Sequence, residues 1–318
     1  MKKILFSLWR GLESAVLLVG GVWCTGVAIW VWEFAGCRLA AWSICIAFLW
    51  LAGVFCLRAR TVLWILEMSV ACSFWMLTPE RQFSANKWNV ECQKIAQISY
   101  LDDGKIRIGN VRDFQYRSVD DYDVRYVTLT TDVNLLESMD IAFSHWDDLE
   151  CVAHMLLCFN FRDGKRVAVS FEPRVPAGKR GGDFFLGIYR RYGQMMLIGT
   201  PEDLFDLRSV YRKETFYCYR TEARQEVLQR IFLRVIERAA HLEKKAEFYH
   251  SLTENCTTGL LAAINDEVSL RNWDSRMLFN GFYDKYLFEK GFLSHQKGES
   301  FWALKARSYV PGFNRKEK

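Results

Sequence analysis

The sequence lacks the features that identify most metalloproteins. It contains no CxxC pair and only five histidines, and its His and Cys spacing fits no zinc motif. We therefore expect no metal ion and no cofactor. The formal charge of +5 over 318 residues is too small an excess to indicate a nucleic-acid-binding protein. Internal repeats, low-complexity segments and long linkers are also absent, which argues against a repeat architecture.

Tryptophan and other apolar residues are concentrated near the N-terminus. Eight of the twelve tryptophans lie in the first quarter of the chain. Residues 14–32 and 39–57 carry no charge, and residues 61–79 carry only Glu67. Each stretch is about 20 residues long, enough for a helix to cross a bilayer. A cleaved signal peptide explains the first stretch poorly, because the apolar run is too long and two more follow it.

These stretches predict a membrane anchor with three transmembrane helices in residues 1–79 and a separate domain in residues 80–318. Basic residues precede the first stretch and fill the gap between the second and third, whereas the first gap has only Arg38. The positive-inside rule then places the N-terminus in the cytoplasm and the C-terminal domain in the periplasm of a Gram-negative cell. We expect a multi-pass protein of the bacterial inner membrane whose partners include membrane lipids. We interpret Glu67 as protonated or hydrogen-bonded to a neighbouring helix, with a functional role as the alternative.

The remaining residues predict one α+β domain. Residues 104–118, 122–133, 195–200 and 214–220 have the alternation or the β-branched and aromatic content of strands. Residues 148–174 read as a hairpin. An amphipathic helix is expected at residues 222–245, where apolar residues recur three and four apart, and a further helix begins at Cys256.

The expected hairpin has a register that can be derived from its sequence. Alternate residues are apolar on both strands, and these two apolar sets should face the same core. That condition is met when Phe159 lies opposite Val167, and a G1-bulge turn at Asp163 and Gly164 supplies such a register. The opposite face then carries polar residues of both strands.

His154 and Glu172 lie on that polar face, opposite or diagonal to each other, and Ser170 shares the face. A carboxylate beside a histidine can orient the imidazole for base chemistry. The alternative is a surface His–Glu pair with no function.

Cys256 is the candidate nucleophile. Asn255 is a good N-cap, so Cys256 falls in the first turn of a helix, where the helix dipole favours a thiolate and free N–H groups can bind an oxyanion. The alternative is a buried structural cysteine. Five cysteines lie beyond residue 79, an odd number, so at least one is a free thiol or pairs with another chain. His145 is the rival of His154 for the role of base, and His250 could line the site.

Several segments together resemble the Lnb N-terminal periplasmic domain family. They are NVRDFQYRS, CVAHMLLCFNF, VAVSFEPR, EDLFDLRSVYRKETFYCYR and FYHSLTENCTTGL, which occur in the family's order over roughly residues 85–270. The resemblance implies a circularly permuted papain-like (NlpC/P60-type) fold in which the histidine strand precedes the cysteine helix. It also implies acyl transfer through a thioester, because Lnb-type proteins are implicated in lipoprotein N-acylation.

Carried onto this sequence, the resemblance makes Cys256 the nucleophile and His154 the base. Glu172 becomes an orienting or substrate-contacting group with Arg174 as its neighbour. Further oxyanion or site-lining candidates are Asn255, Thr257, Tyr249, Ser170 and His145. One departure is that the membrane stretches precede the domain here, whereas the Lnb proteins we compare carry them after it.

The sequence therefore predicts a membrane-anchored periplasmic thiol acyltransferase acting on lipoproteins or other lipid-linked substrates. A papain-like peptidase or amidase would use the same Cys–His pair, with water as the acceptor. A third hypothesis is a non-catalytic, membrane-tethered binding module.

Overall fold

The chain divides into two compact units, residues 1–82 and 83–318. The computed structural model describes residues 2–35, 60–77, 87–146, 149–178, 184–264 and 274–311. Helices α1 (Lys2–Ala35) and α3 (Arg60–Leu77) belong to the first unit and contact each other through Leu17 and Leu63.

Residues 14–32 and most of residues 61–79 are helical, as the sequence predicts, while the stretch at 39–57 lies outside the described residues. Within the described part of the chain, no helix is both long and apolar enough to cross a membrane. The prediction of three membrane-spanning helices is therefore not supported there. Glu67 is buried and faces α1, where a Cβ added to Gly20 would collide with its carboxylate.

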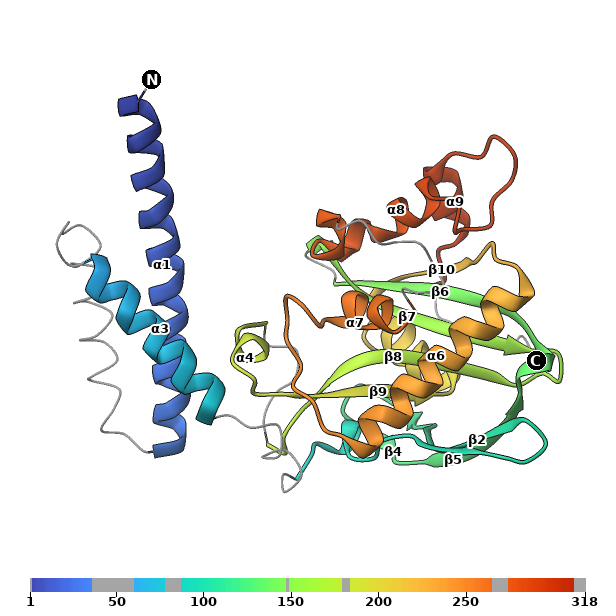
Figure 1. Ribbon diagram of the computed structural model, residues 1–318. Helices are drawn as coiled ribbons and strands as arrows, with labels where there is room; N and C mark the ends of the chain where they lie inside the picture. Colours follow the sequence, from blue (N-terminus) through green and yellow to red (C-terminus); the bar gives the residue numbers. More distant parts are fainter. Residues whose placement is uncertain are drawn as a thin grey trace. The chain divides into compact units, whose positions relative to one another are not determined.

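An eight-stranded mixed sheet forms the centre of the second unit (Figure 1). Its strands are β1 (Gln97–Tyr100), β2 (Lys105–Arg112), β5 (Tyr126–Asp132), β6 (Leu136–Trp146), β7 (Leu149–Phe161), β8 (Arg166–Arg174), β9 (Gly193–Gly199) and β10 (Thr215–Arg220). The order is β1-β2-β9-β8-β7-β6-β10, with β5 also paired to β2. Among the described strands of this sheet, the short β2–β9 pairing is the only parallel one. A separate ribbon pairs β3 (Gln115–Tyr116) with β4 (Tyr122–Asp123).

Helices and short turns cover both faces of this sheet. They are η2 (Val90–Cys92), η3 (Val133–Leu135), α4 (Phe184–Ile188), α5 (Pro201–Leu204), the π-helical turn η4 (Leu207–Tyr211), α6 (Gln225–Lys244), α7 (Cys256–Ile264), η5 (Ser275–Met277), η6 (Asn280–Phe282), α8 (Tyr283–Glu289) and α9 (Phe301–Arg307). The α+β class is confirmed.

The amphipathic helix predicted at 222–245 is α6, which lies across one face of the sheet (Figure 1). Phe232 of α6 packs edge-on against Phe159 of β7, with ring centroids 5.0 Å apart. On the same face, Phe171 of β8 contacts α7 so closely that a Cβ at Gly259 would lie 2.5 Å from its ring. The apolar set of the hairpin therefore faces the core shared with α6 and α7.

The hairpin of β7 and β8 has the predicted register. Phe159 pairs with Val167, and Gly164 adopts a φ of +82° in the turn, a conformation that favours glycine. The two strands separate beyond the pair Leu156–Ser170, because β8 continues along β9 while β7 stays with β6. This separation exposes one edge of β7 at residues 153–155, and the candidate site is built there.

Candidate active site

Cys256 is the first residue of α7, and its helix is capped as the sequence suggests. Asn255 Oδ1 accepts hydrogen bonds from the N–H groups of Thr257 and Thr258, both at 3.0 Å. This cap places the buried thiol against the part of β7 that is not paired with β8. Cys256 Sγ lies 3.8 Å from the carbonyl oxygen of Ala153 and accepts a hydrogen bond from the backbone of Met155.

His154 lies beside Cys256, and its Nε2 is engaged on the far side of the ring. Nε2 is 2.9 Å from Glu172 Oε1 and 2.6 Å from Ser170 Oγ. The Ser170 hydroxyl donates to Glu172 Oε1 over 2.9 Å, so Nε2 must be the donor to Ser170. Nδ1 is therefore the ring atom of His154 that forms the hydrogen bond with Cys256. The polar face predicted for the hairpin carries His154, Ser170 and Glu172, and α7 brings Cys256 to them.

Arg208, which the sequence did not indicate as a site residue, completes the row of charges. Its Nη2 donates to Glu172 Oε1 over 2.8 Å, and its Nη1 donates to the carbonyl oxygen of Leu204 over 2.8 Å. It lies in the π-helical turn η4, a type of turn that is often found at functional sites. The family segment EDLFDLRSVYRKETFYCYR contains this arginine, but nothing in the segment indicates that it contacts a carboxylate 36 residues earlier.

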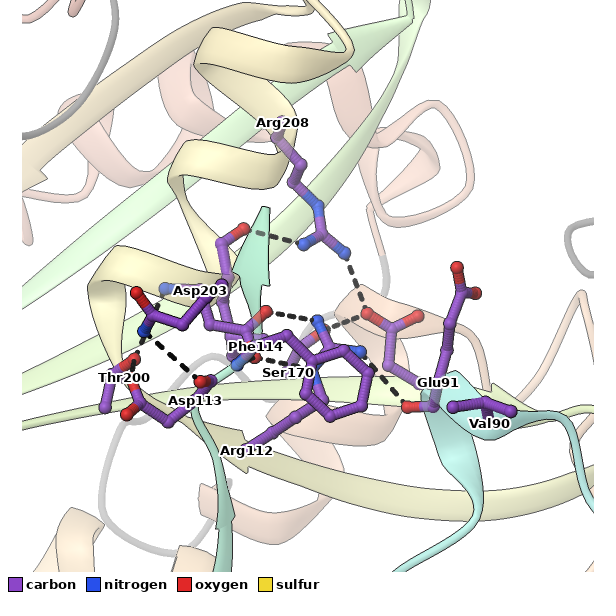
Figure 2. Close-up of polar contacts among 12 residues, drawn as sticks. Val90, Glu91, Arg112, Asp113, Phe114, Ser170, Thr200, Asp203 and Arg208 are labelled. Carbon is purple, nitrogen blue, oxygen red and sulfur yellow. Dashed lines mark hydrogen bonds and ion pairs between the residues drawn. The ribbon is translucent and has the colours of Figure 1, made fainter. Parts of the chain in front are cut away.

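A second buried ion pair positions the segment that carries Arg208 (Figure 2). Arg112 of β2 donates to both carboxylate oxygens of Asp203, from Nε over 2.9 Å and from Nη2 over 2.7 Å. Asp203 also accepts from the N–H of Phe114 over 2.7 Å. Because Asp203 lies in α5, directly before η4, this bidentate pair fixes η4 to the sheet.

Electrostatics favour a thiolate–imidazolium pair. Burial raises the pKa of Cys256, but the charge and hydrogen bond of His154 outweigh it, so the pKa falls below 9.0. Burial lowers the pKa of His154, but the negative charges of Glu172 and Cys256 raise it to about 9. Burial also raises the pKa of Glu172, and His154 and Arg208 bring it well below its ordinary value. Charges thus alternate along the row from the thiol to Arg208.

Asn280 was also not anticipated from the sequence. Its Nδ2 lies 3.3 Å from Cys256 Sγ and 3.2 Å from Thr257 Oγ1, and its Oδ1 accepts from the N–H of Ala153 over 2.8 Å. A lone asparagine in a loop carries no pattern, so only the fold places it at the thiol.

A cavity of about 860 Å³ opens onto these groups. Cys256, His154, Glu172, Asn255 and Tyr249 all line it, and burial together with Cys256 and Glu172 raises the pKa of Tyr249. Thr257 and Ser170 are fully buried behind the lining. Most of the lining is apolar, and four of its large side chains are exposed: Trp146, Leu149, Phe184 and Leu278. This volume lies in the usual range for small-molecule sites.

Two predicted site residues lie elsewhere. Arg174 donates to the carbonyl oxygens of Cys92 and Gln93 and lies over the Trp88 ring, so it does not line the cavity and Arg208 takes its place beside Glu172. His145 pairs with Ala153 in the β6–β7 register, so its side chain points to the face opposite His154.

The surroundings of His145 also argue against it as the base. His145 packs edge-on against Tyr217, and its buried Nε2 has no hydrogen-bond partner among the described residues. Burial and Lys305 lower its pKa. His250 is not among the residues lining the cavity. Within the described ranges, no group of three or more His, Cys, Asp or Glu side chains is placed to hold a metal ion.

The family model of the Lnb N-terminal periplasmic domain matches residues 122–281. The chain belongs to this family. The matched region contains every member of the row Cys256–His154–Glu172–Arg208, and Asn280 as well. Membership in the Lnb family supports a periplasmic location for the domain, in agreement with the sequence prediction. No curated protein and no solved structure matches the chain.

The pH behaviour of this Lnb-family site should depend on Glu172. Replacing Glu172 with glutamine removes the charge that holds the imidazolium, so the pKa of His154 should fall by about 1–3 units from about 9. The thiolate–imidazolium pair exists between the pKa of Cys256 and that of His154, so its upper limit should move to lower pH. NMR titration of the His154 ring proton measures the shift. Glu247→Gln removes a carboxylate outside the cavity and should leave that titration unchanged; an unmoved His154 in Glu172→Gln would contradict the assignment.

Proposed function

We propose that this Lnb-family protein is a membrane-anchored periplasmic thiol acyltransferase that acts on lipoproteins or other lipid-linked substrates through a thioester on Cys256. One observation carries the proposal. A thiol with a lowered pKa and its hydrogen-bonded imidazole line a largely apolar cavity of about 860 Å³. An acyl chain needs such a lining, and an acyl carbonyl needs such a nucleophile.

The residues at the site can carry out each proton transfer and each bond change of the two half-reactions. The Cys256 thiolate attacks the carbonyl carbon of an acyl ester, and the His154 imidazolium gives its proton to the leaving alkoxide, which leaves a thioester and a neutral imidazole. His154 then takes a proton from the acceptor amine as this attacks the thioester. Collapse returns the thiolate and the imidazolium, while Glu172 keeps the imidazole oriented throughout.

We also propose that residues 1–79 anchor the domain to the inner membrane and that the domain has a permuted papain-like fold. The charge-free stretches of the sequence support the anchor. The order of the elements supports the fold, since the histidine strand β7 precedes the cysteine helix α7 and the start of α7 meets the sheet at the thiol.

The hydrolase hypothesis uses the same residues and differs only in the acceptor. The apolar lining supports the transferase, because a peptide or peptidoglycan substrate would be expected to meet a more polar cleft. A disulfide at Cys256, or a wide separation between Cys256 and His154, would have favoured a binding module. Cys256 is instead a free thiol that is hydrogen-bonded to His154.

Trapping the thioester tests the proposal. Membranes containing the full-length protein are incubated with a phospholipid that carries an alkyne-labelled acyl chain, without an amine acceptor. The label should appear on the Cys256 peptide by mass spectrometry and be released by neutral hydroxylamine. Addition of a diacylated lipopeptide with a free N-terminal amine should move the label to that amine. Absence of the thioester, or release of the acyl chain only to water, would overturn the transferase proposal.

A further inference from the structure

The Asn280 side chain is held in one orientation beside the candidate nucleophile. The N–H of Ala153 can only donate, and it lies 2.8 Å from Asn280 Oδ1, so the amide oxygen must face β7. The NH₂ group therefore faces the thiol. One of its hydrogens is directed to Thr257 Oγ1 at 3.2 Å and the other to Cys256 Sγ at 3.3 Å.

The backbone around Asn280 fixes this position. Turn η6 occupies the edge of β7 that β8 leaves, and Asn280 is 6% exposed. Gly281 permits the close approach, because a Cβ there would overlap the carbonyl oxygen of Glu150. The amide is thus anchored at its oxygen, at its nitrogen and through the next residue, as preorganised electrostatic catalysis requires.

The helix terminus offers fewer free donors than the sequence led us to expect. The N–H groups of Thr257 and Thr258, which follow the thiol in the first turn, are both bonded to Asn255 Oδ1. Of the first-turn N–H groups this leaves that of Cys256 itself, so a second donor to an oxyanion on a carbonyl attached to Sγ must come from another element. Asn280 Nδ2 meets this need, since the oxyanion would lie two bonds from a sulfur that the amide already contacts.

We infer that Asn280 Nδ2 is the oxyanion-hole donor for attack by Cys256, an inference that rests on the proposed function. As the bond between Sγ and the carbonyl carbon forms, the carbonyl π pair moves onto oxygen, and Nδ2 donates a hydrogen bond to that oxyanion while keeping both of its protons. Collapse expels the leaving alkoxide, which takes the proton of His154, and the thioester carbonyl is restored. Asn280 is thus a catalytic residue that the matched family region contains.

Two reactions of the same thiol separate this role from a structural one. Alkylation by iodoacetamide needs the thiolate but forms no oxyanion, whereas acylation by p-nitrophenyl butyrate passes through a tetrahedral oxyanion. Asn280→Ala should slow acylation of Cys256 by about 100- to 1,000-fold, the usual loss for one oxyanion-hole donor, and change alkylation by less than about fivefold. Asn280→Leu, which is uncharged and of similar size but lacks the NH₂ donor, should show the same split.

The matched control is Asn160→Ala. Asn160 lies at the other end of β7 and donates to Ser138 and Asp140, so its loss tests the general cost of removing a strand-bound amide. It should leave both rates unchanged. All rates are measured on the full-length protein in detergent, at one pH, with peptide mass spectrometry to confirm Cys256 as the modified residue.

Equal slowing of acylation and alkylation in Asn280→Leu would overturn the inference, because it would assign the amide to stabilisation of the thiolate or to packing. Unchanged acylation in Asn280→Ala would also overturn it. A wild-type protein whose Cys256 is alkylated but never acylated would instead refute the proposed function, so the two failures are distinguishable.

Discussion

Replacement of Cys256 with alanine should abolish the acyl-enzyme and lower acyl transfer by about 10,000-fold or more, as loss of a catalytic nucleophile does elsewhere. The expected loss is large because the row Arg208–Glu172–His154 ends at this one sulfur. Alanine is compatible with the first turn of α7, so the fold should persist. The measurement is transfer of a labelled acyl chain from phospholipid to a lipopeptide amine in membranes containing each variant.

Cys158→Ala is the matched control for that experiment. Like Cys256, Cys158 is a buried free thiol, but it lies on β7. Burial raises its pKa to about 12, and no imidazole opposes this effect. Its replacement should leave acyl transfer unchanged. Transfer by Cys256→Ala within tenfold of wild type would show that another group forms the covalent intermediate or that none is formed.

Replacement of His154 with alanine should have the second largest effect. Without the imidazolium, mainly the backbone hydrogen bond of Met155 still opposes the effect of burial on Cys256, so the pKa of the thiol should rise. At neutral pH the thiolate fraction, and with it alkylation by iodoacetamide, should fall by about 100-fold. Acyl transfer should fall further, by about 1,000-fold or more, because the proton donor to the leaving group is also lost. The rate of Cys256 alkylation against pH, followed by peptide mass spectrometry, locates the pKa.

His145→Ala tests which of the two histidines, His145 or His154, acts as the base. His145 points to the opposite face of β6 and β7 and contacts Tyr217, not the cavity. We expect the pH profile of Cys256 alkylation to be unchanged in this variant. A shift of the profile in His145→Ala with none in His154→Ala would reverse the assignment of the base.

The sequence predicted the local geometry of the hairpin because strand periodicity leaves few choices. Once the two apolar sets had to share a core, Phe159 had to lie near Val167, and the structure has that pair. The same parity placed His154, Ser170 and Glu172 on one face. Strand β6 was not predicted, since Glu137, Asp140 and other polar residues interrupt its apolar alternation, and its pairing on both sides with β7 and β10 compensates.

Other parts of the site depend on contacts between distant segments. The resemblance to the Lnb family placed Arg174 beside Glu172, yet carbonyl groups at Cys92 and Gln93 bind its guanidinium. Arg208 reaches Glu172 instead, from a turn held by the Arg112–Asp203 pair. No periodicity encodes either outcome, because each depends on which polar groups tertiary packing leaves unpaired.

The sequence by itself determined the α+β class, the helix beginning at Cys256, the hairpin register and the resemblance to the Lnb family, because each depends on neighbouring residues or on motifs in order. Only the tertiary structure decided how the thiol and the imidazole meet. Separation of β8 from β7 after Ser170 frees backbone groups at Ala153 and Met155, and Cys256 and Asn280 fill that edge. The physical reason is that exposed strand edges must find hydrogen-bond partners, and those partners come from wherever the chain brings them.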